Sequence, residues 1–176
     1  MPSILTLCGS LRAQSSNRAI LHAYAQLAPD LAFTPFEGLG DLPHFNPDLD
    51  RDDLPLPATV AQLRALVHSA DALVLSTPEY AHGLPGSFKN ALDWLVSDVV
   101  FPGKPVVILA ADRGSRWAYD SLCEILRTMS AKVLADACVF LPLGTNRVDP
   151  STILAHADCR HLLEASLRHL RGHLNP

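Results

Sequence analysis

A short apolar run leads directly into a polar loop at residues 3–18, which read Ser3-Ile4-Leu5-Thr6-Leu7-Cys8-Gly9-Ser10-Leu11-Arg12-Ala13-Gln14-Ser15-Ser16-Asn17-Arg18. Residues 3–8 have the composition and length of a β-strand. From Ala19 to Leu27, apolar residues recur at the spacing of an amphipathic helix. The segment therefore predicts a strand, a loop and a helix in succession, which is the first unit of an α/β fold.

The loop between this strand and this helix is predicted to bind a phosphate group. The N-terminus of a helix offers free backbone N–H groups and the positive end of the helix dipole. Hydroxyl and guanidinium groups add strong hydrogen bonds to an anion. The loop matches neither G-x-G-x-x-G nor G-x-x-x-x-G-K-[ST], so its chemistry suits a phosphomonoester. A helix cap is the alternative, but a cap needs only one oxygen. The candidate phosphate-binding residues are Ser10, Arg12, Ser15, Ser16 and Asn17.

Length and composition place the chain among globular α/β proteins. Its 176 residues are enough for one hydrophobic core, so we expect a single domain over 1–176. The net charge of -4 and the lack of a basic stripe argue against a nucleic-acid partner and an anionic membrane surface. The first apolar run is too short for a secretory or membrane segment, so a cytoplasmic location is expected. The four cysteines lack metal-ligand spacing, and no metal site is expected.

Strand-like and helix-like segments alternate along the rest of the chain. Strands are predicted at about 3–8, 31–36, 72–77 and 105–110 and within 133–141. Helices are predicted at about 17–28, 60–67, 85–101, 122–126 and 151–170, and a long loop at 37–54. Five strands alternating with helices predict a parallel sheet with right-handed crossovers. Because ligands of such sheets bind beyond the carboxyl ends of the strands, the loops after the first, third and fourth strands should converge.

The loop after the third strand has the composition of a site for a planar ring. It reads Pro78-Glu79-Tyr80-Ala81-His82-Gly83-Leu84-Pro85-Gly86-Ser87-Phe88-Lys89-Asn90-Ala91-Leu92-Asp93-Trp94. Two prolines and two glycines at its start hold the backbone in defined turns, which suits hydrogen bonding from main-chain groups to a ring edge. The alternative is a turn whose aromatic side chains pack locally.

Together, the loop at Gly9–Asn17 and the motif at Thr77–Trp94 resemble the NADPH-dependent FMN reductase family, which includes quinone, chromate and azo-dye reductases. The intervening segment Leu42–Leu49 is also similar to that family. The similarity covers about the first hundred residues, and the remainder matches only in the order of its elements. The resemblance implies a flavodoxin-like, doubly wound fold of three layers, with a five-stranded parallel sheet in the order 2-1-3-4-5 and FMN bound non-covalently.

The resemblance also implies roles for individual residues. The residues of the first loop would hold the FMN phosphate. The ring would be lined by Pro78, Glu79, Tyr80, Ala81, His82 and Gly83, and by Asp112 and Gly114 after the fourth strand. Two features depart from the family pattern. Ala81 and His82 follow Pro-Glu-Tyr where the family usually has Asn, and residues 110–117 replace a glycine-rich loop. Asp112 would need Arg113 or Arg116 to neutralise it beside a reduced flavin.

No catalytic side chain is predicted, because a flavin carries the hydride chemistry and the protein orients it. We interpret Glu79 as a positioning or dimer-contact residue, with an acid–base role as the alternative. His82 is either a proton donor to the acceptor or an ordinary loop histidine. Either NADPH or NADH could be the co-substrate. Arg113 and Arg116 are candidates for binding the 2′-phosphate of NADPH.

The predicted function is an FMN-dependent NAD(P)H oxidoreductase that passes electrons to a quinone-like or other small acceptor by ping-pong hydride transfer. One alternative is a flavodoxin-type electron carrier with protein partners. Another is a flavin-free scaffold or regulatory protein of the same fold. The apolar residues Val99, Val100 and Phe101 indicate either core burial or a subunit interface, and the latter would fit a homodimer or homotetramer.

Overall fold

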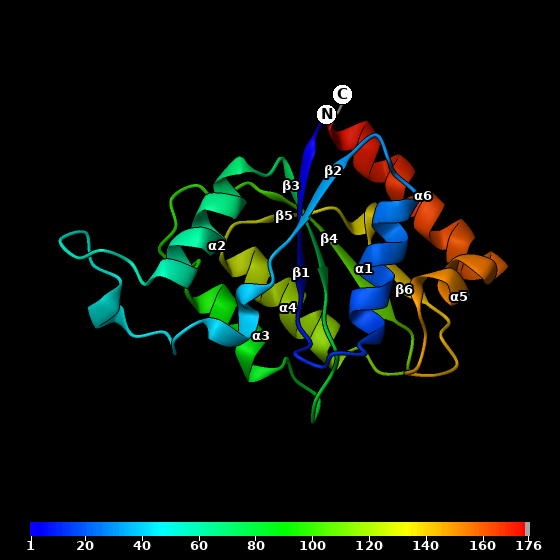
Figure 1. The fold of residues 1–176 in the computed structure, drawn as a ribbon, viewed down its shortest axis with the longest axis horizontal. Helices are drawn as coiled ribbons and strands as arrows, with labels where there is room; N and C mark the ends of the chain where they lie inside the picture. The colour runs from blue at the N-terminus through cyan, green and yellow to red at the C-terminus, as the bar shows by residue number, and fades with distance from the viewer. Residues whose placement is uncertain (175–176) are drawn as a thin grey trace.

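A parallel β-sheet forms the centre of the molecule in the computed structural model, which describes residues 1–174 (Figure 1). The strands are β1 (Ser3–Cys8), β2 (Ala32–Pro35), β3 (Ala72–Ser76), β4 (Pro105–Ala111), β5 (Lys132–Val133) and β6 (Val139–Leu141). They are hydrogen-bonded in the order β2-β1-β3-β4-β5, and β6 also pairs with β4. The order 2-1-3-4-5 expected from the family resemblance is confirmed.

Helices cover both faces of the sheet, which confirms the expected three layers (Figure 1). One face is covered by α1 (Ser16–Gln26), α5 (Pro150–Ala155) and α6 (Ala157–Leu174). The other is covered by α2 (Ala58–Ser69), α3 (Gly86–Asp93) and α4 (Trp117–Thr128). Successive strand residues point to opposite faces. Val74 of β3 therefore packs toward α1 and α6, whereas its neighbours Leu73 and Leu75 pack toward α2 and α3.

The central strand β3 ends beside β1, and the site lies at the edge of the sheet where these two strands end. All five of its residues are buried, as expected for a parallel strand with a helical layer on each side. In the parallel pairing with β1, Cys8 lies opposite Ser76, so both strands end at the same level. The loops that follow them therefore leave the same edge of the sheet side by side.

The predicted fifth strand is wrong in one respect, because it is two short strands separated by the 3₁₀ turn η3 (Ala135–Ala137). Lys132 lies opposite Pro105, and Val139 lies opposite Leu109. The chain therefore advances by seven residues between these two pairings while β4 advances by four. The three surplus residues form the turn. Cys138, directly after the turn, places its Sγ 3.3 Å from the Ile108 N–H, which is thereby supplied with an acceptor.

The predicted C-terminal helix is also two helices, because His156 interrupts it. The backbone of His156 is extended, and its Nδ1 accepts a hydrogen bond of 3.4 Å from the Cys159 N–H, so it acts as a cap for α6. Asp149 caps α5 in the same manner by accepting a 2.7 Å hydrogen bond from the Thr152 N–H. Asp149 thus marks the start of α5, and the break at His156 explains why one apolar period gives two helices.

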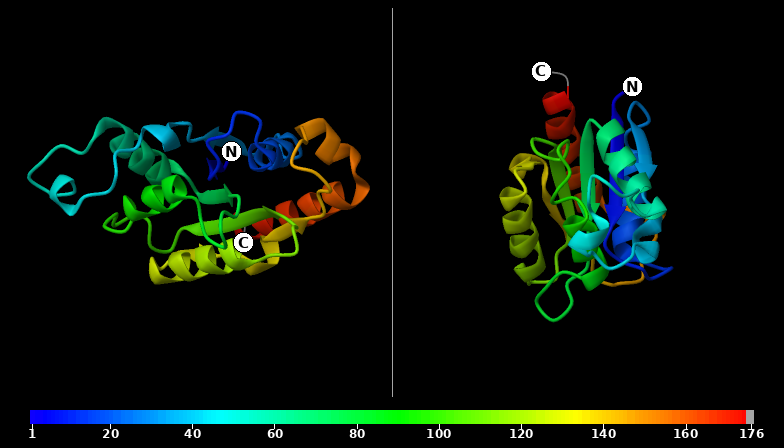
Figure 2. Two further views of the ribbon diagram at one scale, coloured as in Figure 1. Left: turned by 90° about the horizontal axis from the view of Figure 1, so that it is seen from below. Right: turned by 90° about the vertical axis from the view of Figure 1, so that its left-hand side faces the viewer.

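The long loop contains two short 3₁₀ helices, η1 (Gly38–Asp41) and η2 (Pro47–Leu49), and then extends beyond the rest of the molecule on the side of α2 (Figure 2). Asn90 of α3 fastens the base of the extension. Its side chain accepts a 2.7 Å hydrogen bond from the Phe45 N–H and donates one of 3.0 Å to the Pro43 carbonyl. The extension is thus anchored on α3.

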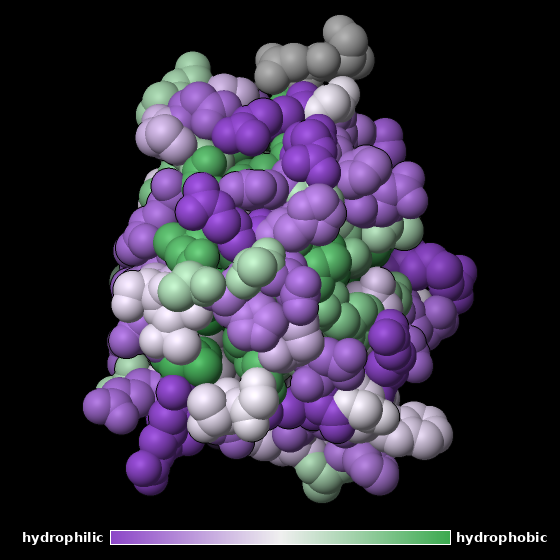
Figure 3. Space-filling view, turned by 90° about the vertical axis from the view of Figure 1, so that its right-hand side faces the viewer, coloured by the Kyte–Doolittle hydropathy of each residue, from purple (hydrophilic) through white to green (hydrophobic). Residues whose placement is uncertain are grey.

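None of the helices within residues 1–174 is long and apolar enough to span a membrane. On the side of the molecule formed by α5 and α6, hydrophilic residues dominate the surface, and hydrophobic residues form separate small groups (Figure 3).

Candidate functional site

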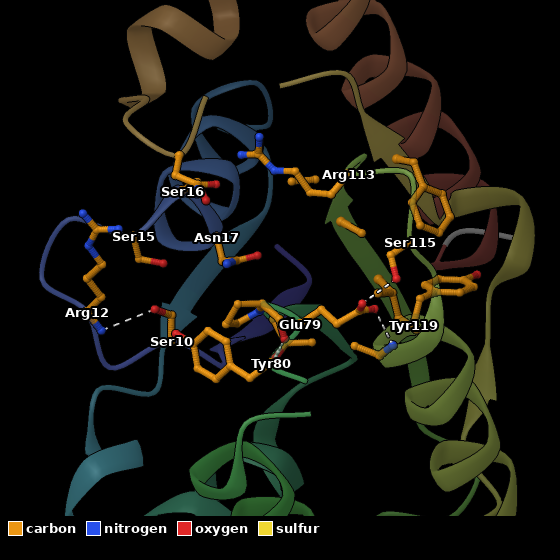
Figure 4. Close-up of a pocket in the computed structure, with 18 of the residues that line it drawn as sticks. Ser10, Arg12, Ser15, Ser16, Asn17, Glu79, Tyr80, Arg113, Ser115 and Tyr119 are labelled. Carbon is orange, nitrogen blue, oxygen red and sulfur yellow. Dashed lines mark hydrogen bonds between the residues drawn. The ribbon is translucent and has the colours of Figure 1, made fainter. Parts of the chain in front are cut away.

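A cavity of about 330 Å³ opens at the carboxyl ends of β1, β3 and β4 (Figure 4). This is the edge where the sequence predicts that loops converge. The polar loop after β1 forms one end, and the loops after β3 and β4 form the other. Its lining consists of Ser10, Arg12, Gln14, Ser15, Ser16, Asn17, Thr77, Pro78, Glu79, Tyr80, Ile108, Ala110, Ala111, Arg113, Ser115, Ala118, Tyr119, Phe140 and Asn146.

The end formed by the β1–α1 loop is an N-terminal helix site with additional hydroxyl groups. Ser15 is the N-cap of α1, and its Oγ accepts a 3.4 Å hydrogen bond from the Arg18 N–H. The first intrahelical bond is donated by Ala19, so the N–H groups of Ser16 and Asn17 precede it. The hydroxyl of Ser15 still has its own proton to donate. Capping and anion binding are therefore compatible at this helix.

Gly9 and Asn17 join the phosphate-binding loop to the end of β3. The Gly9 N–H donates a 2.8 Å hydrogen bond to the Ser76 carbonyl, and the Ser76 hydroxyl donates one of 3.0 Å to Asn17 Oδ1. A Cβ added to Gly9 would lie 2.2 Å from Oγ1 of Thr77. Only glycine allows this approach of the two strand ends, which fixes the first loop against the second.

Arg12 and Arg18 have different roles, although they are near each other in sequence. Arg12 lines the cavity, and its guanidinium makes no hydrogen bond or ion pair with any residue in 1–174. Arg18 does not line it, because its Nη1 lies 2.5 Å from Oε2 of Glu37. Arg12 is therefore the cation that is free to meet an anion in this cavity.

The opposite end of the cavity is held together by Glu79 (Figure 4). Its Oε2 accepts a 2.9 Å hydrogen bond from the Ala118 N–H in the first turn of α4, and its Oε1 accepts one from the Ser115 hydroxyl. These two hydrogen bonds hold the pKa of the Glu79 carboxyl below its ordinary value, with the Ser115 bond as the larger cause. Glu79 thus replaces the missing side-chain cap of α4 and stays ionised at neutral pH.

Beyond Glu79, the chain makes a tight turn at Tyr80–Gly83. Tyr80 and Gly83 exchange two backbone hydrogen bonds of 3.0 Å, and the two central residues, Ala81 and His82, have φ of 49° and 60°. Such left-handed conformations are costly for residues with a Cβ. His82 stacks on Trp117 with ring centroids 5.6 Å apart, which ties this strained turn to the start of α4.

The loop after β4 carries Asp112, which the family resemblance places beside the flavin, with Arg113 or Arg116 to neutralise its charge. The Asp112 side chain is exposed, lies outside the cavity lining and accepts a 3.1 Å hydrogen bond from the Gly114 N–H. Neither neighbouring arginine pairs with it. Arg113 donates to the carbonyls of Leu143 and Thr145, and Arg116 lies over the ring of Phe140 at 3.8 Å.

The predicted site residues thus divide into two groups. Those brought together in the cavity are Ser10, Arg12, Ser15, Ser16, Asn17, Pro78, Glu79 and Tyr80. Those outside its lining are Ala81, His82, Gly83, Asp112 and Gly114. The second group flanks lining residues in the two ring-side loops, and its contact with a ligand stays a prediction.

Several lining residues were not selected from the sequence. Tyr119 lies three residues before the core position Leu122 in α4, so helical spacing could have placed it on the inner face. Phe140 and Asn146 belong to the strand end and loop after β6, whose carboxyl end reaches the same edge of the sheet. The rule that ligands bind at the carboxyl ends of strands, applied to all strands, would have included this loop.

The cavity therefore has two chemically distinct ends. Free N–H groups, hydroxyls and Arg12 gather at one end, whereas Ala110, Ala111 and Tyr80 offer small apolar and aromatic surfaces at the other. This arrangement fits a ligand that carries a phosphate at one end and a flat ring system at the other.

Comparison with known proteins agrees with this chemistry. A model of the NADPH-dependent FMN reductase family matches residues 2–146. A quinone reductase of Escherichia coli K12 is 33% identical over 156 residues, covering 85% of this chain and 82% of that protein. A 2-hydroxy-1,4-benzoquinone reductase of a Burkholderia species is 30% identical over 168 residues, covering 92% and 90%. Among solved structures, the flavoenzyme FerB, an NAD(P)H:(acceptor) oxidoreductase of Paracoccus denitrificans, has a TM-score of 0.68 and 23% identity, covering 96% of this chain and 99% of that one.

Proposed function

Because the chain belongs to the NADPH-dependent FMN reductase family and is an NAD(P)H-dependent flavin oxidoreductase, we propose that the cavity described above holds its FMN. Ser10, Arg12, Ser15, Ser16 and Asn17 would bind the phosphate. Pro78, Glu79 and Tyr80 would line the ring, with backbone groups up to Gly83 at its polar edge. The observation that carries this assignment is the division of one cavity into an anion-binding end and an apolar end.

When bound, FMN supplies the capacity to accept a hydride from NAD(P)H and to pass electrons on. The protein contributes binding and orientation. Arg12 and the α1 N-terminus neutralise the phosphate, while Glu79 keeps the loop after β3 fixed against α4. Glu79 uses both carboxylate oxygens in these contacts, which leaves it the role of a positioning residue rather than a proton donor.

Donor and acceptor would enter through the same open mouth of the cavity, beside Tyr80, and use it in turn. This predicts ping-pong kinetics, with parallel lines in double-reciprocal plots at several acceptor concentrations. Intersecting lines would show instead that both substrates are bound together.

We propose a quinone or another electron-poor aromatic compound as the acceptor. Relatives that are 30–33% identical to this chain are named as quinone reductases, and a planar acceptor suits a mouth bordered by aromatic rings. The test compares turnover with 1,4-benzoquinone, an azo dye and chromate under the same NADPH concentration. A higher kcat/KM for the quinone supports the proposal, and a higher value for chromate or the dye contradicts it.

The cofactor assignment is tested by an absorbance spectrum of the purified protein, with and without added FMN, followed by anaerobic NADPH. We expect a yellow protein or stoichiometric FMN uptake, and bleaching of the flavin band on addition of NADPH. A protein that takes up no FMN would contradict the cofactor assignment. Uptake without bleaching would favour an electron carrier.

We also propose that the chain works in the cytoplasm as a single flavin-binding domain that forms a homo-oligomer. Phe101 is buried, but Val99 is 89% exposed, and Val96 and Val100 are exposed beside it. The guanidinium of Arg64 donates hydrogen bonds to both Asp50 and Ser97, so the extended loop lies next to this turn. The same loop exposes Leu49 and Leu54.

These exposed apolar residues form a surface that a second copy could cover. Sedimentation analysis tests this idea: wild-type protein should exceed the monomer mass, and Val99→Glu should shift it toward the monomer. A monomeric wild-type protein would contradict it.

A further inference from the structure

A second cavity, of about 370 Å³, lies against the phosphate-binding end of the first. The two cavities share Gln14, Ser15 and Asn146 as lining residues. The second is formed by the start and one side of α1 and by the segment that leads into α5. Its other lining residues are Ala13, Arg18, Ala19, His22, Arg147, Val148, Asp149 and Pro150. A ligand could therefore extend from the first cavity into the second along Gln14 and Ser15.

Among the charged side chains that line this second cavity, Arg147 carries a positive charge that no carboxylate of residues 1–174 balances. The one carboxylate in the lining, Asp149, accepts hydrogen bonds from the Thr152 N–H and the Ser151 hydroxyl. Arg18 is paired with Glu37. The guanidinium of Arg147 makes no hydrogen bond or ion pair with any residue of the described chain. Arg147 is therefore free to bind an anionic group of a ligand.

Arg18 adds a second, independent observation. Its Nε is buried and has no hydrogen-bond partner within residues 1–174. Although the guanidinium is paired with Glu37 through Nη1, a buried N–H without an acceptor is unfavourable, so an oxygen brought next to Nε would be stabilised. Two arginines and the ring of His22 thus line a space beside the phosphate site.

We propose that this second cavity binds the phosphoadenosine group of a dinucleotide, with Arg147 at its phosphate, Nε of Arg18 at another of its oxygens, and the adenosine beside α1. This inference rests on the proposed function, because it places the phosphate of FMN in the adjoining cavity. The arginines selected from the sequence for such a group, Arg113 and Arg116, are occupied by loop carbonyls and by the ring of Phe140.

We consider two sources of this group. NADPH brings a 2′-phosphoadenosine at the end opposite its nicotinamide, so a donor laid along FMN with its nicotinamide on the ring would point this end toward the flavin phosphate. FAD instead carries an AMP half attached directly to the phosphate that FMN leaves terminal. Both place an adenosine and an anionic oxygen in the same cavity, and the experiment distinguishes them.

The test uses the FMN-loaded protein and 2′,5′-ADP as the probe, with 5′-AMP for comparison, both titrated by calorimetry. The variant is Arg147→Ala. The matched control is Arg168→Ala, because Arg168 is exposed on α6, far in sequence from this cavity, and pairs with no residue in the described part of the chain. Melting temperatures and FMN content verify that both variants remain folded and loaded. In parallel, FMN and FAD are titrated into the apoprotein of each variant.

If the second cavity binds the phosphoadenosine group of NADPH, wild-type protein binds 2′,5′-ADP more tightly than 5′-AMP. Arg147→Ala then weakens the affinity for 2′,5′-ADP by about tenfold, as expected for one charge-assisted hydrogen bond. The KM for NADPH then rises while the KM for NADH stays constant. If the second cavity instead binds the AMP half of FAD, the apoprotein binds FAD more tightly than FMN, and Arg147→Ala removes that difference in affinity. Either result supports the inference.

The inference is overturned if Arg147→Ala changes neither the 2′,5′-ADP affinity nor the preference between FAD and FMN. Equal weakening by Arg147→Ala and Arg168→Ala also overturns it, because that result would reflect general electrostatic attraction. FMN uptake and bleaching by NADH do not depend on this cavity. If FMN uptake and bleaching are retained while Arg147→Ala has no effect, the proposed function still holds and only the inference about the second cavity fails.

Discussion

The phosphate-binding end and the ring end of the cavity are built in different ways. Residues Ser10–Asn17 form the phosphate-binding end as one continuous segment, and its contacts are local turns and a helix cap, apart from the hydrogen bond that Asn17 accepts from Ser76. The ring end combines the loops after β3 and β4 with α4 and β6. Its two main contacts join Glu79 to Ser115 and Ala118, which lie 36 and 39 positions further along the chain.

This difference teaches that a ligand's phosphate can be recognised by local structure, whereas its ring depends on how the layers pack. A helix N-terminus offers its N–H groups wherever a helix begins. A flat surface for a ring exists only where separate loops are fixed at a common edge. The two ends should therefore respond differently to substitution, and the following predictions test that difference.

Gly9→Ala should have the largest effect, because it acts at the junction of the two ends. The added Cβ would meet Thr77 at 2.2 Å, so the strand ends must separate. We expect a loss of about 1–3 kcal/mol in the free energy of unfolding, as for other overpacked sites. Urea denaturation measures it.

Gly172→Ala in α6 is the matched control for this substitution. Nothing lies within 4 Å of the added Cβ there, and alanine favours a helix over glycine by up to about 1 kcal/mol. It should leave the protein as stable or more stable. Equal stability of Gly9→Ala and wild type would contradict the close junction described here.

Arg12→Ala should affect only the phosphate-binding end. Arg12 is exposed and its side chain has no partner within residues 1–174, so stability should not change. FMN affinity should fall roughly tenfold, since a hydrogen bond to a charged group contributes about 1.5 kcal/mol or more. Riboflavin, which lacks the phosphate, should bind both proteins equally. Quenching of flavin fluorescence measures both affinities, and a parallel loss for riboflavin would place Arg12 at the ring instead.

Acidification should weaken the ring end before the phosphate-binding end. The pKa of Glu79 is held below its ordinary value by the Ser115 hydroxyl and the Ala118 N–H. Its stabilising contribution is therefore complete above the ordinary pKa of about 4.5 and is lost as the pH falls through the lowered folded value. The melting temperature should be measured between about pH 6 and pH 3, which spans the range in which glutamate side chains titrate. It should fall less steeply with decreasing pH in Glu79→Gln than in wild type. Identical slopes would mean that Glu79 contributes nothing to the acid response.

Glu79→Gln should have the smallest effect on turnover. The glutamine oxygen can still accept from the Ala118 N–H, and its amide can donate to the Ser115 oxygen, so the loop keeps its position. We expect kcat to stay within about threefold of wild type at pH 7, whereas loss of a general acid or base costs about 10²–10⁴-fold. Stopped-flow reduction by NADPH measures it. A loss of that larger size would make Glu79 a catalytic residue.

Much of the fold could be predicted from periodicity and strand composition. The fully buried strand β3 reads as a continuous apolar run, and the order of elements predicts the parallel sheet. Two boundaries were not predictable. The turn at Ala135–Ala137 absorbs three surplus residues between two pairings with β4, and His156 divides a helix whose apolar period continues through it. The turn depends on pairing with β4, which single-sequence patterns do not contain. The His156 cap is a local contact with Cys159, but histidine is not among the residues that usually cap a helix.

For the site, the sequence by itself determined the phosphate-binding segment, because its donors lie in one continuous stretch of chain at a helix start. Only the tertiary structure decided how the ring end is assembled. It directs Glu79 to the cap of α4, turns Arg113 toward Leu143 and Thr145, and leaves Arg147 free beside a second cavity. The physical reason is that a side chain's role follows from the partners within its reach, and these come from segments that only folding brings together.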